Sequence, residues 1–371
     1  MSKDCRVAID CSSLGRQWTG VAHFTYRLTQ SLQEIRPDWD FLLFNGIGWE
    51  RTLSAPSDHH PSIRFWREIP FAYEAWRKVQ RSCFSRLPRS FRPDVFLVPN
   101  HLPPAPCHPI VPIIHDLSHM RMPETHPKGR LRWLSSLQDA AASASEIIAV
   151  SDFTKAEITS LLGVSPDRIS VATPGLSPGF LPQNDARLAP VMDRLGLQSG
   201  TYYLCLAAQE PRKNLSTLIA AHKALPTEFR RDHPLVLAGA AGWGSQIVGA
   251  HDDMVREIGY VPASDLPSLL GGAIALCYPS HYEGFGMPVI EAMACGTPVI
   301  ASTALGLDTA SGDAALRVPP QDVAEWTATM IVITKDKHRR EACIQRGLSH
   351  ASHFSWTETA SVVARVLERV I

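Results

Sequence analysis

Short apolar runs alternate with stretches of helical pattern along most of the chain. This alternation is typical of βαβ units, in which helices cover the faces of a parallel sheet. The strands predicted in the first half are Arg6–Asp10, Phe41–Phe44, Val95–Val98, Ile110–His115, Ile147–Val150 and Ile169–Val171. Those predicted in the second half are Tyr202–Leu206, Leu235–Leu237, Ala273–Tyr278 and Val299–Ala301. The pattern therefore predicts an α/β protein with two doubly wound parallel sheets.

The length of 371 residues also favours two domains, because one domain usually holds about 100–200 residues. The segment Thr173–Pro190 is rich in proline and glycine, which disfavour regular structure, and we interpret it as the linker between the domains. Doubly wound sheets bind ligands outside the carboxyl ends of their strands. We therefore expect two sheets that face one another with a ligand between them.

The composition excludes several classes of protein. Apolar residues make up 45% of the chain and charged residues 19%, which excludes a disordered protein. No run approaches the roughly 18 apolar residues of a membrane span, and the N-terminus has no apolar signal core, so we expect a cytoplasmic protein, soluble or peripheral to a membrane. The net charge of +0 argues against a nucleic-acid binder, and the 8 scattered cysteines are typical of reduced thiols.

The most informative stretch runs from Tyr278 to Ser302. A predicted strand ends near Pro279, a glycine-containing loop follows, and Pro288 stands where a helix would begin. A glycine turn that opens into a helix presents free N–H groups to a phosphate. Glu283 and Glu291 are placed to contact two parts of one ligand, such as a sugar and a ribose. The alternative is a plain strand–helix connection in which Glu291 is only a favourable charge near a helix start.

These residues resemble a known family. The string E-G-F-G-M-P-V-I-E resembles the E-x7-E element of retaining nucleotide-sugar glycosyltransferases, and the chain as a whole resembles family four of that class, which has the GT-B fold. The resemblance covers nearly the whole length and takes in Trp18-Thr19-Gly20-Val21, His115-Asp116-Leu117-Ser118, Val150-Ser151-Asp152-Phe153-Thr154-Lys155, Glu210-Pro211-Arg212-Lys213-Asn214-Leu215 and Gly259-Tyr260-Val261-Pro262.

The resemblance implies two Rossmann-like domains with a cleft between them. Residues 1–180 would bind the acceptor, residues 181–352 would bind a nucleoside-diphosphate sugar, and residues 353–371 would form a helix that crosses back onto the first domain. The implied reaction is the retaining transfer of a hexose. The best guess for the donor is GDP-mannose or a related GDP-hexose. The acceptor would be a saccharide or a polyprenyl-diphosphate-linked saccharide in bacterial surface polysaccharide synthesis.

The candidate catalytic residues are His115, Arg212, Lys213 and Glu283. Arg212 and Lys213 follow a predicted strand, where two adjacent cations suit a diphosphate whose charge increases as the sugar leaves. The alternative is a solvated basic turn, and a lone His115 could equally be structural. The resemblance implies that the cations replace a metal and that no cofactor is needed. It also implies a donor-binding set of Gly20, Val21, Tyr260, Val261, Tyr282, Gly284, Phe285, Gly286, Met287 and Glu291.

A basic segment, Arg64–Arg92, holds eight Lys+Arg and two Glu. Phe71, Ala75, Val79 and Cys83 recur at a spacing of four residues, which predicts one helical face. This face is either a stripe that packs on the core or part of a surface that meets anionic lipid or a lipid-diphosphate acceptor.

Two other functions share this sequence pattern. A sugar-nucleotide epimerase or hydrolase of the same fold would turn over the donor without an acceptor. An inactive nucleotide-sugar-binding protein would not turn it over at all. Release of nucleoside diphosphate that depends on an acceptor distinguishes the transferase from both.

Overall fold

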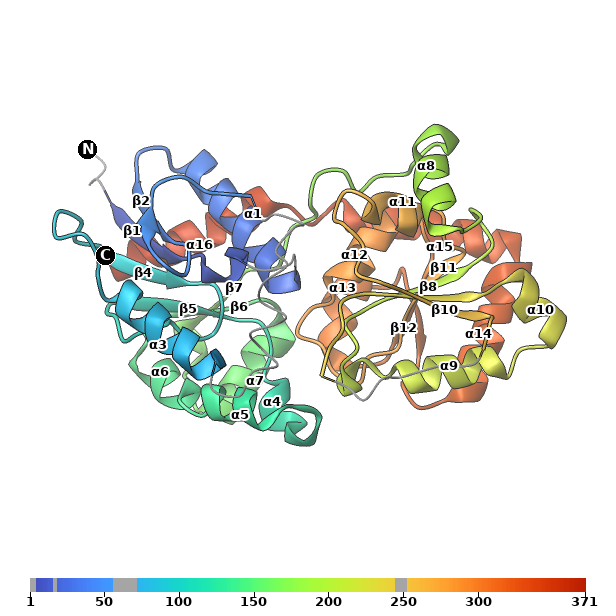
Figure 1. Cartoon of the computed structure of the whole chain (residues 1–371), viewed down its shortest axis with the longest axis horizontal. Helices are drawn as coiled ribbons and strands as arrows, with labels where there is room; N and C mark the ends of the chain where they lie inside the picture. Colours follow the sequence, from blue (N-terminus) through green and yellow to red (C-terminus); the bar gives the residue numbers. More distant parts are fainter. Residues whose placement is uncertain (1–4, 16–18, 56–71, 244–251) are drawn as a thin grey trace. The chain divides into compact units, whose positions relative to one another are not determined.

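The computed structural model describes residues 5–15, 19–55, 72–243 and 252–371, and these form two compact units (Figure 1). The first unit comprises Met1–Leu117, Arg132–Gly175 and Ser355–Ile371, and the second comprises Ser118–Leu131 and Leu176–Phe354. Each unit is a sheet covered by helices, so the predicted α/β class with two parallel sheets is confirmed.

The sheet of the first unit has the strand order β3-β2-β1-β4-β5-β6-β7. All pairs are parallel except the one between β2 and β3. The strands are β1 (Arg6–Asp10), β2 (Asp40–Phe44), β3 (Trp49–Glu50), β4 (Val95–Val98), β5 (Ile110–Ile114), β6 (Ile147–Ala149) and β7 (Ile169–Val171). The helices are α1 (Gly20–Ile35), α3 (Ala72–Phe84), α6 (Leu137–Ser143), α7 (Asp152–Leu162) and α16 (Trp356–Val370), with the short 3-10 helices η1 (Ser12–Gly15) and η3 (Pro166–Arg168). Helix α5 (Lys128–Leu134) begins in the second unit and ends in the first.

The sheet of the second unit has the order β10-β9-β8-β11-β12-β13, with every pair parallel. The strands are β8 (Tyr203–Leu206), β9 (Leu235–Ala238), β10 (Val255–Gly259), β11 (Ala275–Tyr278), β12 (Val299–Ser302) and β13 (Leu316–Val318). The helices are α4 (Ser118–Arg121), α8 (Asp185–Leu195), α9 (Leu215–Lys223), α10 (Thr227–Asp232), α11 (Leu266–Gly271), α12 (Met287–Ala294), α13 (Asp308–Ser311), α14 (Val323–Lys335) and α15 (Lys337–Ala351), with the 3-10 helices η2 (Pro123–Thr125), η4 (Pro211–Lys213) and η5 (Leu305–Leu307).

The order of the second sheet reverses between β8 and β11, which are neighbours although the strands β9 and β10 lie between them in the sequence. At such a reversal the chain leaves the two strands toward opposite faces of the sheet. The loops that follow them therefore leave a crevice at their carboxyl ends, where ligands bind in this class of fold. The loops after β8 and β11 carry Arg212, Lys213 and Glu283, whereas Tyr260 and Val261 follow β10.

Every predicted strand is present, with its ends within two residues of the prediction. Three strands were not predicted: β3, β10 and β13. All three lie at a sheet edge, where a strand pairs on one side only and needs no continuous apolar run. For example, β10 (Val255–Gly259) has a single buried position, Val255, and the positions after it alternate between half-buried and exposed.

The interpretation of Thr173–Pro190 as a linker without regular structure is wrong in its last part. Helix α8 begins at Asp185 and contains Pro190 in its interior. The side chain of Asn184 caps the helix by accepting a hydrogen bond from the backbone N–H of Arg187 at 3.1 Å. Burial of Leu188, Val191 and Met192 on one face offsets the cost of the proline, about 3 kcal/mol.

The chain passes between the units four times, and two of these connections, at Gly175–Leu176 and at Phe354–Ser355, lie side by side. The N–H of Leu176 donates to the carbonyl oxygen of Phe354 at 3.1 Å. A Cβ on Gly175 would lie 2.2 Å from the backbone nitrogen of Trp356, so only glycine fits there. Beyond this point α16 packs on α1, where the rings of Trp356 and Phe24 are 5.4 Å apart.

The exposure of helix α3 shows that one interpretation of the basic segment Arg64–Arg92, an apolar stripe that packs on the core, is wrong. The residues up to Phe71 lie outside the described residues, but Ala75 and Val79 are exposed, so they do not form a stripe that packs on the core. Only the end of α3 reaches the core, where the Phe84 ring lies 5.0 Å from that of Phe44. Across the described part of the chain, no helix combines the length and the hydropathy needed to cross a membrane.

Candidate active site

The turn between β11 and α12 is built as a phosphate-binding turn would be. Gly286 caps α12 with φ 97, a left-handed conformation that favours glycine, and a Cβ there would lie 2.5 Å from the Cδ2 of Leu307. Pro288 lies in the first turn of the helix, as predicted. The N–H groups of a first helical turn have no partner within the helix, so they face whatever occupies the turn.

The two cations come from the turn after β8, and this turn is tied to the one after β11. The backbone N–H of His281 donates to the carbonyl oxygen of Arg212 at 2.8 Å. Asn214, in the left-handed conformation with φ 55, donates from its side chain to the carbonyl oxygen of Pro279 at 3.1 Å and to that of Pro320 at 2.5 Å. These bonds hold Arg212 and Lys213 beside the glycine turn, as the strand order requires.

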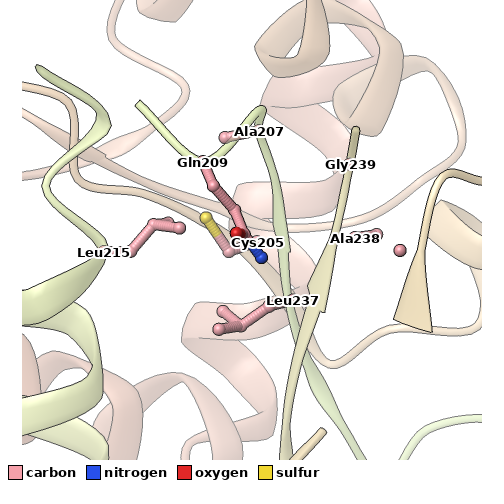
Figure 2. A pocket seen from close by; sticks show the side chains of 8 residues that line it. Cys205, Ala207, Gln209, Leu215, Leu237, Ala238 and Gly239 are labelled. Carbon is pink, nitrogen blue, oxygen red and sulfur yellow. The ribbon is translucent and has the colours of Figure 1, made fainter. Parts of the chain in front are cut away.

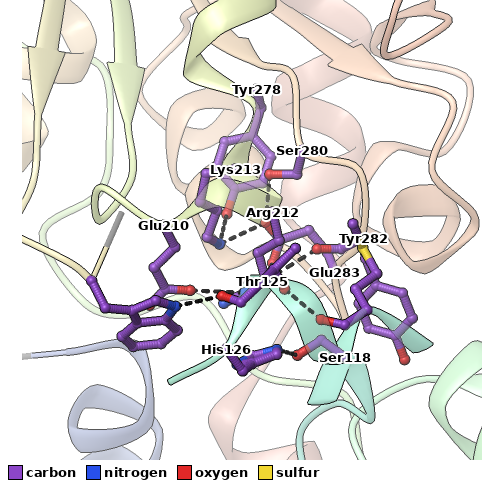
Figure 3. Close-up of polar contacts among 12 residues, drawn as sticks. Ser118, Thr125, His126, Glu210, Arg212, Lys213, Tyr278, Ser280, Tyr282 and Glu283 are labelled. Atoms are coloured by element: carbon purple, nitrogen blue, oxygen red, sulfur yellow. Dashed lines mark hydrogen bonds and ion pairs between the residues drawn. The ribbon is translucent and has the colours of Figure 1, made fainter. Parts of the chain in front are cut away.

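Glu283 accepts from both cations (Figure 3). Its Oε1 lies 2.6 Å from Nζ of Lys213, and its Oε2 lies 3.2 Å from Nη1 of Arg212. Burial would raise the pKa of Glu283, but the charges of Lys213 and Arg212 outweigh it and hold this pKa below its usual value. Glu283 is therefore ionised at neutral pH, and the alternative of a solvated basic turn at Arg212-Lys213 is wrong.

Three further side chains belong to this cluster and were not predicted. Glu210 accepts from Nε of Arg212 at 2.8 Å, and Ser280 donates to Oε1 of Glu283 at 2.6 Å. The hydroxyl of Tyr278 lies 3.2 Å from Nζ of Lys213, and burial followed by the Glu283 charge raises the pKa of Tyr278 well above its usual value. Glu210 and Ser280 each stand close in sequence to a predicted residue, which was the available signal.

Glu291 lies on α12 and is only 8% exposed. Burial raises the pKa of its carboxyl to about 7. Among the described residues it has no ion-pair partner that would offset this burial. Glu291 lies beyond the first turn of α12, and its burial disfavours the charged form, so the alternative of a favourable charge near the helix start does not fit its surroundings.

A small pocket lies at the carboxyl ends of β8 and β9 (Figure 2). Its lining residues are Cys205, Ala207, Gln209, Leu215, Leu237, Ala238, Gly239 and Gly259. Gly239 has φ 147, and a Cβ there would lie 2.1 Å from the carbonyl oxygen of Ala207, so glycine is required. Tyr260 and Val261, both in the predicted donor-binding set, directly follow Gly259.

The other predicted residues of the turn between β11 and α12 differ in their contacts and in their burial. The backbone oxygen of Tyr282 accepts from Arg212 at 3.2 Å. The ring of Phe285 packs on Phe354, with centroids 5.6 Å apart, so it is part of the local core. Gly284 is buried in the turn, and Met287 is half-buried at the first position of α12.

The candidate residues of the first unit lie at the carboxyl ends of its strands and at the start of α1. Nε2 of His115, just after β5, lies 2.6 Å from the carbonyl oxygen of Pro99. Burial lowers the pKa of His115, which favours the neutral ring. A carbonyl oxygen only accepts, so Nε2 carries the proton and Nδ1 is left as an acceptor. A second histidine, His101, was not among the predicted site residues, and the centre of its ring lies 5.7 Å from that of His115.

Gly20 and Val21 form the first turn of α1. The hydroxyl of Thr19 caps this helix by accepting from the N–H of Ala22 at 3.3 Å, which starts the helix one residue after the cap. Trp18 lies outside the described residues.

The segment Ser118–Leu131 follows β5 in sequence but belongs to the second unit. Nε1 of Trp243 donates to the carbonyl oxygen of Thr125 at 2.7 Å, and the rings of His126 and Trp243 are 5.7 Å apart. Ser118 Oγ lies 3.0 Å from Nε2 of His126 (Figure 3). No sequence signal joins residues this far apart. In the part of the chain that the structure describes, no group of His, Cys, Asp and Glu side chains is arranged to hold a metal ion.

Comparison with known proteins gives the family. The model described as Glycosyltransferase Family 4 matches residues 18–180, and the one described as Glycosyl transferases group 1 matches residues 194–350. The O-antigen chain mannosyltransferase B of Escherichia coli is 34% identical over 353 residues, which cover 91% of this chain and 93% of that protein. The chain belongs to glycosyltransferase family 4. The resemblance found in the sequence is therefore confirmed, and the transferase is favoured over the epimerase or hydrolase.

This family 4 glycosyltransferase has the GT-B fold. WaaG, a glycosyltransferase involved in lipopolysaccharide biosynthesis, superposes with a TM-score of 0.71 at 15% identity, covering 97% of this chain and 99% of WaaG. HepE of Anabaena in complex with UDP-glucose superposes with a TM-score of 0.71 at 16% identity, covering 98% of this chain and 99% of HepE.

Proposed function

We propose that the protein is a retaining, metal-independent mannosyltransferase that moves mannose from GDP-mannose to a growing bacterial surface polysaccharide. The observation that carries this proposal is the buried cluster of Arg212, Lys213 and Glu283 at the start of α12. The transferred mannose and the polysaccharide acceptor are suggested by the E. coli O-antigen chain mannosyltransferase B, which is related to the chain over nearly its whole length, and GDP is the nucleotide that the family resemblance favours.

The second domain, residues 181–352, would hold the donor. The diphosphate would take the N–H groups of the Gly284–Gly286 turn and the two cations, because all of them come together at one corner of the sheet. Glu291 would accept from the ribose hydroxyls, and the base would lie near Tyr260 and Val261, beside the small pocket. Glu283 would accept from hydroxyls of the transferred sugar.

The reaction would proceed on one face of the sugar. The bond between the anomeric carbon and the diphosphate oxygen breaks as the acceptor oxygen bonds to the same face of that carbon. The leaving phosphate oxygen takes the acceptor proton. Arg212 and Lys213 stabilise the charge that develops on the diphosphate, so no metal is needed. Because these cations keep the pKa of Glu283 low, Glu283 is a weak base, and the proposal gives it no proton to remove.

The first domain, residues 1–180, would bind the acceptor, and the helix of residues 353–371 would complete it. His115 would lie beside the transferred sugar, where its Nδ1 accepts a hydrogen bond from a hydroxyl. The neutral ring suits this role, because a protonated imidazole could only donate.

The surface of α3 would meet an anionic membrane that carries a polyprenyl-diphosphate-linked acceptor at the cytoplasmic face. Trp76 and Val79 are 38% and 47% exposed, and Lys78 and Arg81 are exposed on the same helix. Apolar side chains beside basic ones are typical of helices that lie at a lipid surface. Arg77 is half-buried, with its guanidinium 5.4 Å from the centre of the Trp133 ring, and would not take part.

Acceptor-dependent release of nucleoside diphosphate tests the proposed activity. Incubation with GDP-mannose and a mannose-terminated oligosaccharide should release GDP and form a product whose new linkage keeps the α configuration, as measured by NMR. UDP-glucose serves as the competing donor. Release of GDP without acceptor would indicate a hydrolase, and an inverted linkage would refute retention.

A further inference from the structure

The charges of the buried cluster cancel. Glu210 and Glu283 are ion-paired with Arg212 and Lys213, and the four side chains are between 8% and 12% exposed. Both carboxylate oxygens of Glu283 accept from a cation. The cluster therefore holds two positive and two negative charges. In this form it offers a diphosphate little net attraction.

A diphosphate in the glycine turn would lie next to Glu283. Glu283 directly precedes Gly284, and it accepts from the same two cations that a phosphate would use. Like charges at short distance repel strongly where water is excluded. Arrival of the diphosphate therefore requires Glu283 to give up its contacts with Arg212 and Lys213.

The intact donor can compensate Glu283 for these lost contacts, but the product cannot. The hydroxyls of the sugar can donate hydrogen bonds to the carboxylate of Glu283. A nucleoside diphosphate without its sugar has no such group in this place. Once the sugar has left, Glu283 loses the sugar hydroxyls and competes with the diphosphate for the two cations.

We propose that Glu283 exchanges partners during turnover, from the two cations that it contacts in this structure to the sugar hydroxyls of a bound donor, and that this exchange makes the site prefer the intact donor to the nucleoside-diphosphate product. The inference rests on the proposed function, because it needs a diphosphate-linked sugar in this turn. It gives Glu283 a role in product release as well as in donor recognition.

Glu210 provides the matched control. It is as buried as Glu283 and ion-pairs with Arg212 alone among the described residues. The substitutions Glu210→Gln and Glu283→Gln remove the same charge from the same cluster. Only Glu283 lies in the turn that meets the sugar, so only its substitution should alter the balance between donor and product.

Calorimetry on the full chain with GDP and with GDP-mannose tests the proposal. Glu283→Gln should bind GDP about tenfold more tightly than the wild type, since a charge-assisted hydrogen bond is worth about one factor of ten or more. It should bind GDP-mannose no more tightly, and GDP should become a stronger product inhibitor. Glu210→Gln should change both dissociation constants by the same factor.

Ser280→Ala supports the test if Glu283→Gln does not fold, as judged by circular dichroism. It keeps every charge and removes only the 2.6 Å hydrogen bond that Ser280 donates to Glu283, so Glu283 depends more on the two cations. GDP should therefore bind more weakly to Ser280→Ala than to the wild type, with a smaller change for GDP-mannose, and tighter GDP binding would overturn the exchange. Weaker GDP binding by Glu283→Gln, or an equal change for both ligands, overturns the exchange. If the wild type binds neither the GDP pair nor UDP and UDP-glucose, the proposed function itself fails.

Discussion

Replacing Glu291 with glutamine should stabilise the protein above neutral pH and have a smaller effect in mild acid. The substitution keeps the shape of the side chain and removes a carboxyl that is 8% exposed. Burial raises the pKa of this carboxyl to about 7 from 4.5. The folded protein therefore holds a proton on Glu291 that the unfolded chain has already released between those two pH values.

The sign of the effect follows from this difference in bound protons. Stability falls as pH rises wherever the folded state binds more protons than the unfolded state. The carboxyl costs little below its unfolded pKa of 4.5, and the cost is complete above about 7. Each pKa unit corresponds to about 1.4 kcal/mol, so the cost grows by about 2–3 kcal/mol between pH 5 and pH 8. Glutamine does not titrate, so the variant lacks this pH-dependent destabilisation.

Scanning calorimetry of the wild type and Glu291→Gln from pH 5 to pH 8 measures this difference. One kcal/mol shifts Tm by about 2–4 °C for a unit of 150–250 residues, so the Tm of the variant relative to the wild type should rise by roughly 5–10 °C over this range. Glu341→Gln, at an exposed position of α15, is the control, and its difference should stay constant. If the Tm difference between Glu291→Gln and the wild type also stays constant with pH, burial does not raise the pKa of Glu291 and the reasoning is refuted.

Three further predictions concern the charges. Lys213→Ala should lower kcat about 100–1,000-fold with a smaller change in donor KM, because a preorganised charge acts mainly on the transition state; a normal kcat with only a raised KM would contradict this. Turnover should survive excess EDTA, and restoration of a chelated enzyme by Mg²⁺ or Mn²⁺ would show that the charge assignment is wrong. Neutralising Lys78 and Arg81 should reduce cosedimentation with anionic liposomes, while neutralising Lys337 and Arg339 on the second unit should not. Equal binding by all variants would contradict the proposal that the surface of α3 meets a membrane.

Much of the fold could be predicted from the sequence because central parallel strands are buried on both faces and appear as short apolar runs. The turn from Tyr278 to Ser302 was also predictable, since its glycines, Pro288 and Gly296 fix where the strand ends and where α12 begins and stops. The edge strands could not be predicted in this way. Nor could the true start of α8 be predicted, since packing of its apolar face overrides the proline inside it.

For the candidate site, too, local patterns were predictable from the sequence and contacts between distant residues were not. By itself the sequence determined which residues are candidates for the site, because a glycine turn, a pair of adjacent cations and two spaced carboxyls are local patterns in the chain. Only the tertiary structure decided how they are paired. The strand order brings the turn after β8 against the turn after β11, so residues about 70 positions apart come within hydrogen-bond distance. That neighbourhood gives Glu283 two cations and leaves Glu291 buried without one, and it sets their pKa values in opposite directions because burial and charge pairing are properties of the folded chain.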